Sequence, residues 1–402
     1  MRQAPIAGLS SRIRWLVEAA DIFATAQIDG LEPEGYLDLV ARVSGVPRPV
    51  VDASLATTAA ALRDMAATIE RIRPTGVVTE WDDPAAADGT AVWVPRGHVF
   101  AVHTEGNTPG VHSVWPEALA LGYQVVVHPS NREPFTASRL VSAIRATGFG
   151  NAAVSLLPCD DATAQVIVSE ADFSQHIGDD DPSNRRVLPE SPGRSKMLIT
   201  ADARWQDHIE LIARAVTGFG GAACIATTSV LVEHDASGCA EALAHHLSEI
   251  PTLPPQHPRA ILPAQTLDRA RHIDRYLRGV ARDSRCWLGG DTVVAELDTG
   301  GAVLRPAVHE VSSSTAPQLD IKLPFPCVWV APWSPADGIG PLCRSVAVTV
   351  LTDDRDLIEA LVREPTISNV YAGPYPTTWM RSTLPHNGYL ADLLMRTKSF
   401  VR

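Results

Sequence analysis

The sequence predicts an α/β protein whose sheets are mainly parallel. Short apolar, β-branched runs alternate with helical stretches along most of the chain, an order typical of βαβ units. The chain has 402 residues, enough for two or three domains, and 45% of them are hydrophobic. These observations predict a globular protein with a large core.

The expected elements follow one another without an internal repeat. We expect strands at residues 92–94, 98–103, 124–128, 153–157, 197–200, 225–233, 327–330 and 346–351. We expect helices at residues 53–72, 112–121, 135–147, 204–217 and 237–249. The five prolines between residues 251 and 263 predict a loop or a domain boundary, because no helix could cross them.

Charge and apolar patterning exclude two kinds of partner. The 46 Asp+Glu against 34 Lys+Arg give a net charge of −12, which repels a phosphate backbone, so nucleic acid is not expected. Charged residues interrupt the N-terminal stretch and no eighteen apolar residues run together, so we expect a cytoplasmic protein without a membrane span. The six cysteines lack any CxxC or Cys/His ligand spacing, which predicts reduced thiols and no metal site.

The stretch "GFGGAAC", residues 218–224, places one cysteine shortly after a glycine pair, with two alanines between them. It matches a G-x-G-x-x-A dinucleotide fingerprint only in letters, because these glycines follow a helix and precede a strand, the reverse of the required order. Glycine permits positive φ and close backbone approach, so the pattern favours a thiol held on a tight turn with its N–H open to a ligand. The alternative is a packed thiol, since free cysteine is among the most buried residue types. The other five cysteines lack such a turn, and we expect them in the core or on helix surfaces.

Longer segments extend this motif in both directions. "ESPGRSKMLITAD" (190–202), a helix and "GFGGAAC" together resemble the aldehyde dehydrogenase superfamily, with a spacing of 224 − 190 = 34 positions from Glu190 to Cys224. The segments 95–148 and "LPHNGYL" (384–390) resemble further family elements in the same order. Within the superfamily the chain resembles the acyl-CoA-reductase-like branch, which includes short proteins of phenazine antibiotic biosynthesis.

The resemblance implies a Rossmann-type cofactor domain, an α/β catalytic domain and a small β oligomerisation arm. The cofactor domain would comprise residues 1–79 and 97–192, the catalytic domain 193–390, and the arm 80–96 and 391–402. In the family this arm pairs with a second subunit, so a homodimer or higher homo-oligomer is expected.

The resemblance also implies the chemistry. Cys224 matches the thiolate nucleophile, Asn107 the amide that stabilises the oxyanion, and Glu190 the base that activates water. Taken alone, Asn107 could be a turn residue and Glu190 a solvated loop residue. NAD(P)H is the implied cofactor. The positions implied to contact the cofactor are His128, Pro129, Ser130, Gly178 and Phe325, and those near the substrate are Gly220, Gly221 and His386.

The chain departs from the family where the cofactor binds. The family's ribose-binding lysine is His128 here, and its ribose-binding glutamate is Leu323. Only about a dozen residues separate "DFSQHIG" (172–178) from Glu190, too few for the family's turn and full pyrophosphate helix. The aspartates 179–181 disfavour a pyrophosphate unless a cation bridges them, and they could equally form an exposed acidic loop.

Three classes of function follow. The favoured one is NAD(P)H-dependent reduction of an activated acyl group, carried on CoA, a carrier protein or an adenylate, to an aldehyde through S-acyl Cys224, in secondary metabolism. The same path reversed would oxidise an aldehyde to the acid. The second class is a non-redox cysteine acyltransferase or thioesterase that has lost its cofactor, and the third is a non-catalytic scaffold.

Overall fold

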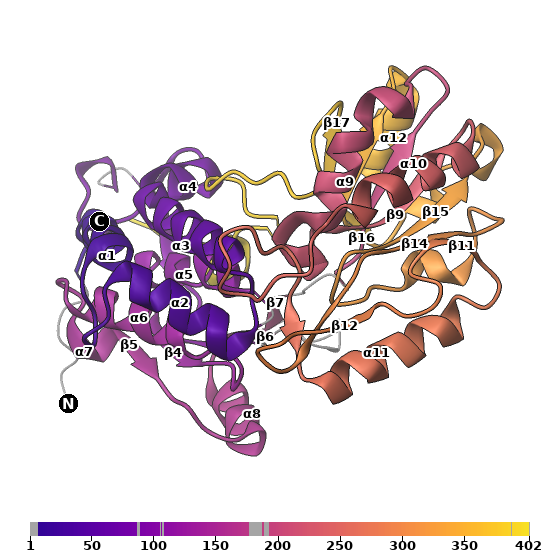
Figure 1. Cartoon of the computed structure of the whole chain (residues 1–402). Helices are drawn as coiled ribbons and strands as arrows, with labels where there is room; N and C mark the ends of the chain where they lie inside the picture. The colour runs from indigo at the N-terminus through magenta and orange to yellow at the C-terminus, as the bar shows by residue number, and fades with distance from the viewer. Residues whose placement is uncertain are drawn as a thin grey trace. The chain divides into compact units, whose positions relative to one another are not determined.

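The computed structural model describes residues 7–86, 89–104, 106, 108–176, 187–188, 193–386 and 388–401. The chain forms two compact units (Figure 1). Unit 1 comprises Met1–Val43, Val51–Glu190 and Arg381–Arg402, and unit 2 comprises Ser44–Val50 and Ser191–Met380.

Unit 1 contains a parallel sheet of five strands in the order β5-β4-β3-β6-β7. The chain runs from β3 outward to β4 and β5, and then returns to β6 and β7 on the other side of β3. The strand order therefore reverses between β3 and β6, and in open α/β sheets ligands bind beyond the carboxyl ends of the strands at such a switch point. The strands are β3 (Val99–His103), β4 (Gln124–His128), β5 (Val154–Leu156), β6 (Phe173–His176) and β7 (Val187–Leu188).

Helices connect and cover these strands. The connecting helices are α5 (Pro116–Ala120), α6 (Phe135–Arg145), α7 (Gly150–Ala153) and α8 (Asp161–Glu170), and the N-terminal helix α1 (Leu9–Thr25) packs against α5 and α6. Between α1 and β3 the chain also forms α2 (Pro33–Ser44), α3 (Arg48–Arg63) and α4 (Met65–Ile72). The prediction of one helix over 53–72 is wrong, since α3 and α4 meet at Asp64. Its backbone (φ −88, ψ 8) leaves helical geometry, and its carboxylate accepts a hydrogen bond from Ser382.

A small separate sheet also belongs to unit 1. Strand β2 (Thr90–Pro95) pairs with β1 (Val77–Val78) in parallel and with β18 (Met395–Phe400) in antiparallel register, and α13 (Leu390–Leu394) directly precedes β18. The segments 80–96 and 391–402 of the predicted arm contribute β2 and β18 to this sheet, and β1 precedes residue 80. Within the described residues, β18 is an edge strand with mostly exposed side chains.

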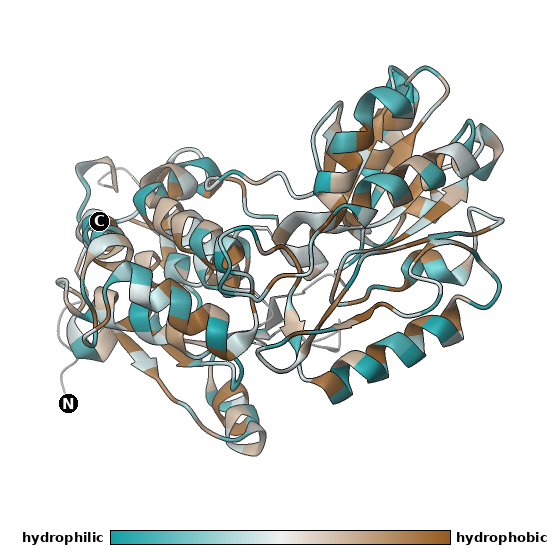
Figure 2. Ribbon diagram, viewed as in Figure 1, coloured by the Kyte–Doolittle hydropathy of each residue, from teal (hydrophilic) through white to brown (hydrophobic). Residues whose placement is uncertain are grey.

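Unit 2 is built on a sheet of seven strands in the order β11-β14-β15-β9-β8-β16-β17, parallel except for β11. Every residue of β8, β9 and β16 is buried, and brown is widespread in the sheet of unit 2 in the hydropathy view (Figure 2). Complete burial of this kind is expected in parallel strands covered on both faces. The strands are β8 (Ser195–Ile199), β9 (Thr227–Val232), β11 (Arg285–Leu288), β14 (Ala307–Glu310), β15 (Cys327–Pro332), β16 (Ser345–Leu351) and β17 (Ile367–Ala372).

Alternate side chains of these strands bury two different sets of helices. Met197 and Ile199 of β8 pack with helices α9 (Ile209–Thr217) and α10 (Ala236–Ser248), whereas Leu198 packs with α12 (Arg355–Arg363). The helix α11 (Leu267–Val280) packs with Trp329 of β15 and with the antiparallel sheet β10-β13-β12. These short strands are β10 (Ala264–Gln265), β12 (Val294–Glu296) and β13 (Ala302–Leu304).

The eight strands expected from the sequence all occur, within one or two residues at each end, and the predicted α/β fold is confirmed. Short 3-10 turns fill the connections: η1 (Pro84–Ala86), η2 (Pro109–Ser113), η3 (Trp205–His208), η4 (Gly218–Gly221), η5 (Pro317–Asp320), η6 (Pro335–Asp337) and η7 (Gly340–Leu342). Among the helices that the structure describes, none combines the length and apolarity needed to cross a membrane.

Candidate active site

The turn η4 carries three consecutive residues with positive φ between α9 and Cys224. The φ angles are 51° for Phe219, 71° for Gly220 and 70° for Gly221. Glycine adopts such angles without steric cost, whereas a residue with a Cβ, such as Phe219, does so only under local strain. The chain therefore turns sharply before Cys224, as the glycine pair predicts.

Space as well as φ restricts the two glycines. A Cβ on Gly220 would lie 2.9 Å from Pro263 Cγ and 3.0 Å from Ile261 O. A Cβ on Gly221 would lie 2.4 Å from Pro326 N and 2.6 Å from Phe325 C, which are main-chain atoms that cannot move aside. The turn thus packs closely against the residues that directly precede β15.

Cys224 is half-buried, and hydrogen bonds hold the backbone on both sides of it. Lys322 Nζ donates to Ala223 O at 2.7 Å, Ser195 Oγ donates to Cys224 O at 3.1 Å, and Thr377 Oγ1 donates to Ile225 O at 2.6 Å. Such a backbone has little freedom, so the position of the thiol is fixed by the fold.

Cys224 packs against a small cluster of apolar side chains. Cys224 packs beside a buried cluster that includes Val346, together with Phe219 and Met380. Burial raises the pKa of Tyr371 to about 12, with a smaller contribution from the negative charge of Cys224, so the phenol is neutral at physiological pH. The Cys224 side chain therefore lies in largely apolar surroundings.

The other cysteines divide into two groups. Cys239 and Cys327 are core residues, and burial raises the pKa of Cys239 to about 12 and the pKa of Cys327 further still. The prediction of core or helix-surface positions is wrong for Cys159, Cys286 and Cys343. Cys159 and Cys343 are half-buried in loops, and Cys286 is exposed because it lies on the edge strand β11.

The cofactor positions of unit 1 gather at the carboxyl ends of β3 and β4. His128 Nδ1 lies 2.9 Å from His103 Nδ1, its Nε2 lies 3.1 Å from Cys159 O, and the two imidazole rings stack with centroids 4.6 Å apart. The buried Ser130 donates its N–H to Thr104 Oγ1 at 3.1 Å, and Pro129 between them is also buried. His128 and Ser130 are therefore held by groups of unit 1 itself.

Several predicted residues lie elsewhere. Asn107, Gly178 and Glu190 lie outside the described residues, as do the aspartates 179–181. Phe325 is 1% exposed in the core around α11 and Leu323 packs in the same core, so in this structure Phe325 is a core residue with no free face. His386 is half-buried in unit 1, whereas Cys224 belongs to unit 2.

The structure brings residues to Cys224 that the sequence did not indicate. Lys322 follows it by 322 − 224 = 98 positions and Thr377 by 377 − 224 = 153, and no motif links these residues. Ser195 lies inside the segment "ESPGRSKMLITAD", so its position near Cys224 could have been predicted from the family spacing.

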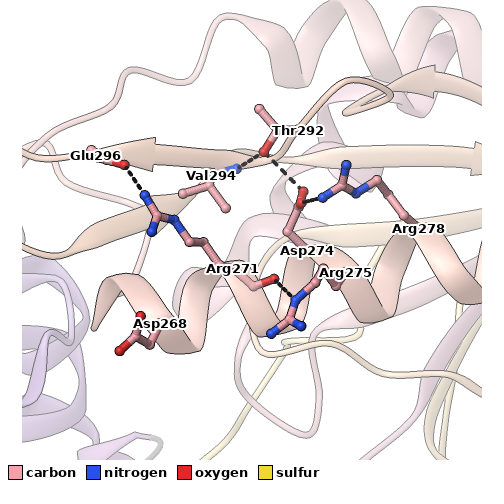
Figure 3. Close-up of a pocket in the computed structure, with 8 residues that line it drawn as sticks. All are labelled: Asp268, Arg271, Asp274, Arg275, Arg278, Thr292, Val294 and Glu296. Atoms are coloured by element: carbon pink, nitrogen blue, oxygen red, sulfur yellow. Dashed lines mark hydrogen bonds and ion pairs between the residues drawn. The ribbon is translucent and has the colours of Figure 1, made fainter.

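An open groove in unit 2 lies along α11 and contains none of the predicted site residues (Figure 3). Its charges are largely paired, with Arg271 bound to Glu296 at 3.1 Å and Arg278 bound to Asp274. Asp274 also accepts hydrogen bonds from Thr292 and from the main-chain N–H of Val293. The groove is lined by Asp268, Arg271, Asp274, Arg275, Arg278, Thr292, Val294 and Glu296, and equal numbers of acidic and basic groups give it no preferred ligand charge.

Comparisons with known proteins identify the family. The family model described as "Aldehyde dehydrogenase family" matches residues 9–320. Aldehyde dehydrogenase 1A1 of Homo sapiens is 30% identical over 143 residues, which is 32% of this chain and 28% of that protein, so the match spans less than a third of the relative's length.

Solved structures extend the likeness to the whole chain. Aldehyde dehydrogenase 21 from Physcomitrella patens superposes with a TM-score of 0.79 at 16% identity, over 98% of this chain and 86% of that one. A gamma-glutamyl-gamma-aminobutyraldehyde dehydrogenase from Burkholderia cenocepacia superposes with a TM-score of 0.78 at 17% identity, over 98% and 84%. These likenesses show the fold, and together with the family match they show that the chain belongs to the aldehyde dehydrogenase family.

Proposed function

We propose that this chain is a cysteine-dependent oxidoreductase that interconverts an activated acyl group and an aldehyde. The physiological direction we favour is NAD(P)H-dependent reduction of an acyl group carried on CoA, a carrier protein or an adenylate, in secondary metabolism. The observation that carries this proposal is Cys224, half-buried beside apolar side chains and three residues after a left-handed turn. A thiol in this setting can hold an acyl group out of reach of bulk water.

The chain's own residues would act in a fixed order. The Cys224 thiolate attacks the acyl carbonyl carbon, and the oxyanion that forms is stabilised by the Cys224 N–H and the Asn107 amide. Collapse of the tetrahedral adduct expels the carrier thiolate or adenylate and leaves S-acyl Cys224. NAD(P)H, when bound, supplies a hydride to the acyl carbon. The resulting hemithioacetal then releases the aldehyde and the free thiolate.

Unit 1 supplies the argument for a dinucleotide. Its parallel sheet reverses strand order between β3 and β6, the kind of position where such cofactors bind. Thr104, His128, Pro129 and Ser130 lie at the carboxyl edge beside this point, and Gly178 follows β6 in the chain. The connection from β6 to β7 spans residues 177–186, which is near the lower limit for a crossover that includes a helix. We therefore propose a cofactor held with fewer contacts to its pyrophosphate than in longer relatives.

One experiment separates the proposed reduction from a reaction without a cofactor. The purified protein is titrated with NADH and NADPH, and reduction of a panel of acyl-CoA thioesters is followed at 340 nm. We expect binding of one dinucleotide and thioester-dependent oxidation of it. Release of CoA without binding of either dinucleotide would instead support the non-redox acyltransferase or thioesterase.

The direction of the reaction is tested through Glu190. Reduction needs no activated water, so Glu190→Gln is expected to keep thioester consumption within about tenfold of the wild type, whereas Asn107→Ala costs about 10²–10³-fold. Oxidation of aldehydes to free acids by the wild type, abolished in Glu190→Gln, would replace reduction by the hydrolytic dehydrogenase reaction.

We also propose a homodimer or a larger homo-oligomer. The exposed edge strand β18 is the basis, because unpaired strand edges commonly pair with a second copy. Light scattering at micromolar concentration is expected to give at least twice the 43.1 kDa chain mass, and a monomer would contradict the proposal.

A further inference from the structure

Lys322 contacts the peptide unit of the nucleophile. Its Nζ donates to Ala223 O at 2.7 Å, and that carbonyl belongs to the same peptide unit as the Cys224 N–H. Ala223 O also accepts the N–H of Ala226 at 3.0 Å, which closes the turn before β9. The lysine thus holds one end of the peptide whose other end carries the predicted oxyanion donor.

Gly193 lies beside both Lys322 and Cys224. A Cβ at this glycine would lie 3.3 Å from Lys322 Nζ and 3.7 Å from Cys224 Cα. The φ of Gly193 is +69°, so both its conformation and its lack of a side chain allow this close approach. The positive charge of Lys322 lies beside the Ala223–Cys224 peptide, since its Nζ donates to Ala223 O.

Lysine is rare in this chain. The sequence contains three lysines, Lys196, Lys322 and Lys398, among 34 basic residues, so arginine provides nearly all of its cations. A lysine ammonium is a compact point charge that fits a narrow place against a carbonyl, which a forked guanidinium does not. The use of lysine at position 322 is therefore consistent with a specific fit.

We propose that Lys322 is a positioning residue of the active site, which orients and polarises the Ala223–Cys224 peptide and favours the Cys224 thiolate. A hydrogen bond to a carbonyl strengthens the N–H donor of the same peptide unit, and a cation near a thiol stabilises its anion. This inference deepens the proposed function and rests on Cys224 being the nucleophile.

Other charged groups near the site are engaged differently. Lys196 donates to Asp320 at 2.9 Å and to Pro341 O at 2.7 Å, while Arg194 and Arg344 lie within 3.7 Å and 3.1 Å of the same carboxylate. On β17, Tyr371 faces Cys224 as a neutral phenol. Lys196 is therefore a matched control: a neighbouring buried lysine of unit 2 that bonds Asp320 and a different carbonyl.

The test uses the full-length protein and two reactions that need no cofactor. Acylation of Cys224 by p-nitrophenyl acetate is followed as a nitrophenolate burst, and alkylation by iodoacetamide is measured from pH 5 to 10 on the Cys224 peptide by mass spectrometry. For Lys322→Met we expect a burst about tenfold or more slower and an alkylation midpoint about one pH unit higher. Lys322→Arg keeps the charge but not the compact shape, so it should recover only part of the shift in the midpoint, and Lys196→Met should leave both measurements within about threefold of the wild type.

The outcomes distinguish this inference from the proposed function. A Lys322→Met protein with wild-type burst and midpoint, or equal changes in Lys322→Met and Lys196→Met, would overturn the role of Lys322. If the wild type lacks redox turnover but Lys322→Met still shifts the alkylation midpoint, the positioning role stands and the proposed reduction fails. Circular dichroism of each variant confirms that the comparison is between folded proteins.

Discussion

The polar side chains at the carboxyl edge of the unit 1 sheet and at the amino edge of the unit 2 sheet make different kinds of hydrogen bonds. At the carboxyl edge of the unit 1 sheet, His128 bonds His103 and a main-chain carbonyl, and Ser130 bonds Thr104. At the amino edge of the unit 2 sheet, the polar side chains of Ser195 and Lys322 bind the main chain on either side of Cys224 and leave the thiol half-exposed. The hydrogen bonds of unit 2 thus support the proposal that Cys224 is the nucleophile. The proposal that unit 1 binds a cofactor depends mainly on its strand order.

The most severe test of this comparison concerns Cys224, the proposed nucleophile. Because acyl transfer through a thioester has no substitute for its sulfur, Cys224→Ala is expected to lower turnover at least about 10³-fold. Iodoacetamide at neutral pH should label Cys224 first, although Cys286 is more exposed, because burial raises the pKa of the Cys286 thiol. Equal labelling of both cysteines, or full activity of Cys224→Ala, would contradict the contrast between the units.

The next test concerns the turn that presents the thiol. Gly221→Ala is expected to cost about 2–4 kcal/mol of stability, because φ is +70° and the new Cβ meets main-chain atoms of Phe325 and Pro326. Gly279→Ala is the matched control: this glycine lies in α11, a Cβ there meets nothing within 4 Å, and alanine should stabilise the helix by about 0.5–1 kcal/mol. Thermal unfolding measures both, and a neutral Gly221→Ala would mean that the turn is less constrained than described.

A third test uses pH, since the units contain buried groups that respond with opposite sign. In unit 1, burial raises the pKa of Glu117 from 4.5 to about 7, although its carboxylate accepts the N–H of Ala391 at 2.9 Å. The folded state binds this proton more tightly than the unfolded state, so the contribution of Glu117 to stability is lost as pH rises from about 4.5 to 7. Glu117→Gln should remove this loss, gaining about 2 kcal/mol relative to wild type at pH 8 compared with pH 5.

In unit 2, burial lowers the pKa of His309 from 6.5 to about 4. The folded state holds this imidazole neutral, so stability is lost as pH falls from about 6.5 to 4, the opposite direction to Glu117. His309→Gln should therefore weaken the acid sensitivity of unfolding while leaving the alkaline side unchanged. Unfolding midpoints from pH 4 to 8 test both variants, and parallel pH profiles of the two variants would contradict the predicted contrast.

The smallest expected effects come from single hydrogen bonds at the two edges. Thr104→Val removes the acceptor for the Ser130 N–H, and Ser195→Ala removes the donor to Cys224 O; each should cost about 1 kcal/mol of stability. Thr104→Val should raise the KM for the dinucleotide with little change in Cys224 acylation, and Ser195→Ala should slow acylation by less than about tenfold with unchanged dinucleotide KM. The same kinetic change in both variants would mean that the edges do not have separate roles.

Much of the fold could be read from the chain because the signals are local. β-Branched runs predicted the eight strands, and the glycine pair before Cys224 predicted a left-handed turn that the structure contains. The prediction of one helix over 53–72 was wrong at Asp64. The apolar periodicity continues through this residue, but its side chain accepts a hydrogen bond from Ser382, which is distant in the sequence. The predictions for Cys159, Cys286 and Cys343 were wrong because the absence of a glycine turn says nothing about how buried a cysteine is.

The sequence by itself determined the α/β class, the family through co-linear motifs, and the turn that leads to the cysteine, since periodicity, glycine chemistry and motif order are properties of short segments. Tertiary structure alone decided which side chains meet there. Lys322 and Thr377 reach the backbone beside Cys224 from 98 and 153 positions away, and His103 pairs with His128 across neighbouring strands. Such contacts depend on strand order and register, which are set by the packing of the whole sheet, so no local pattern in the chain encodes them.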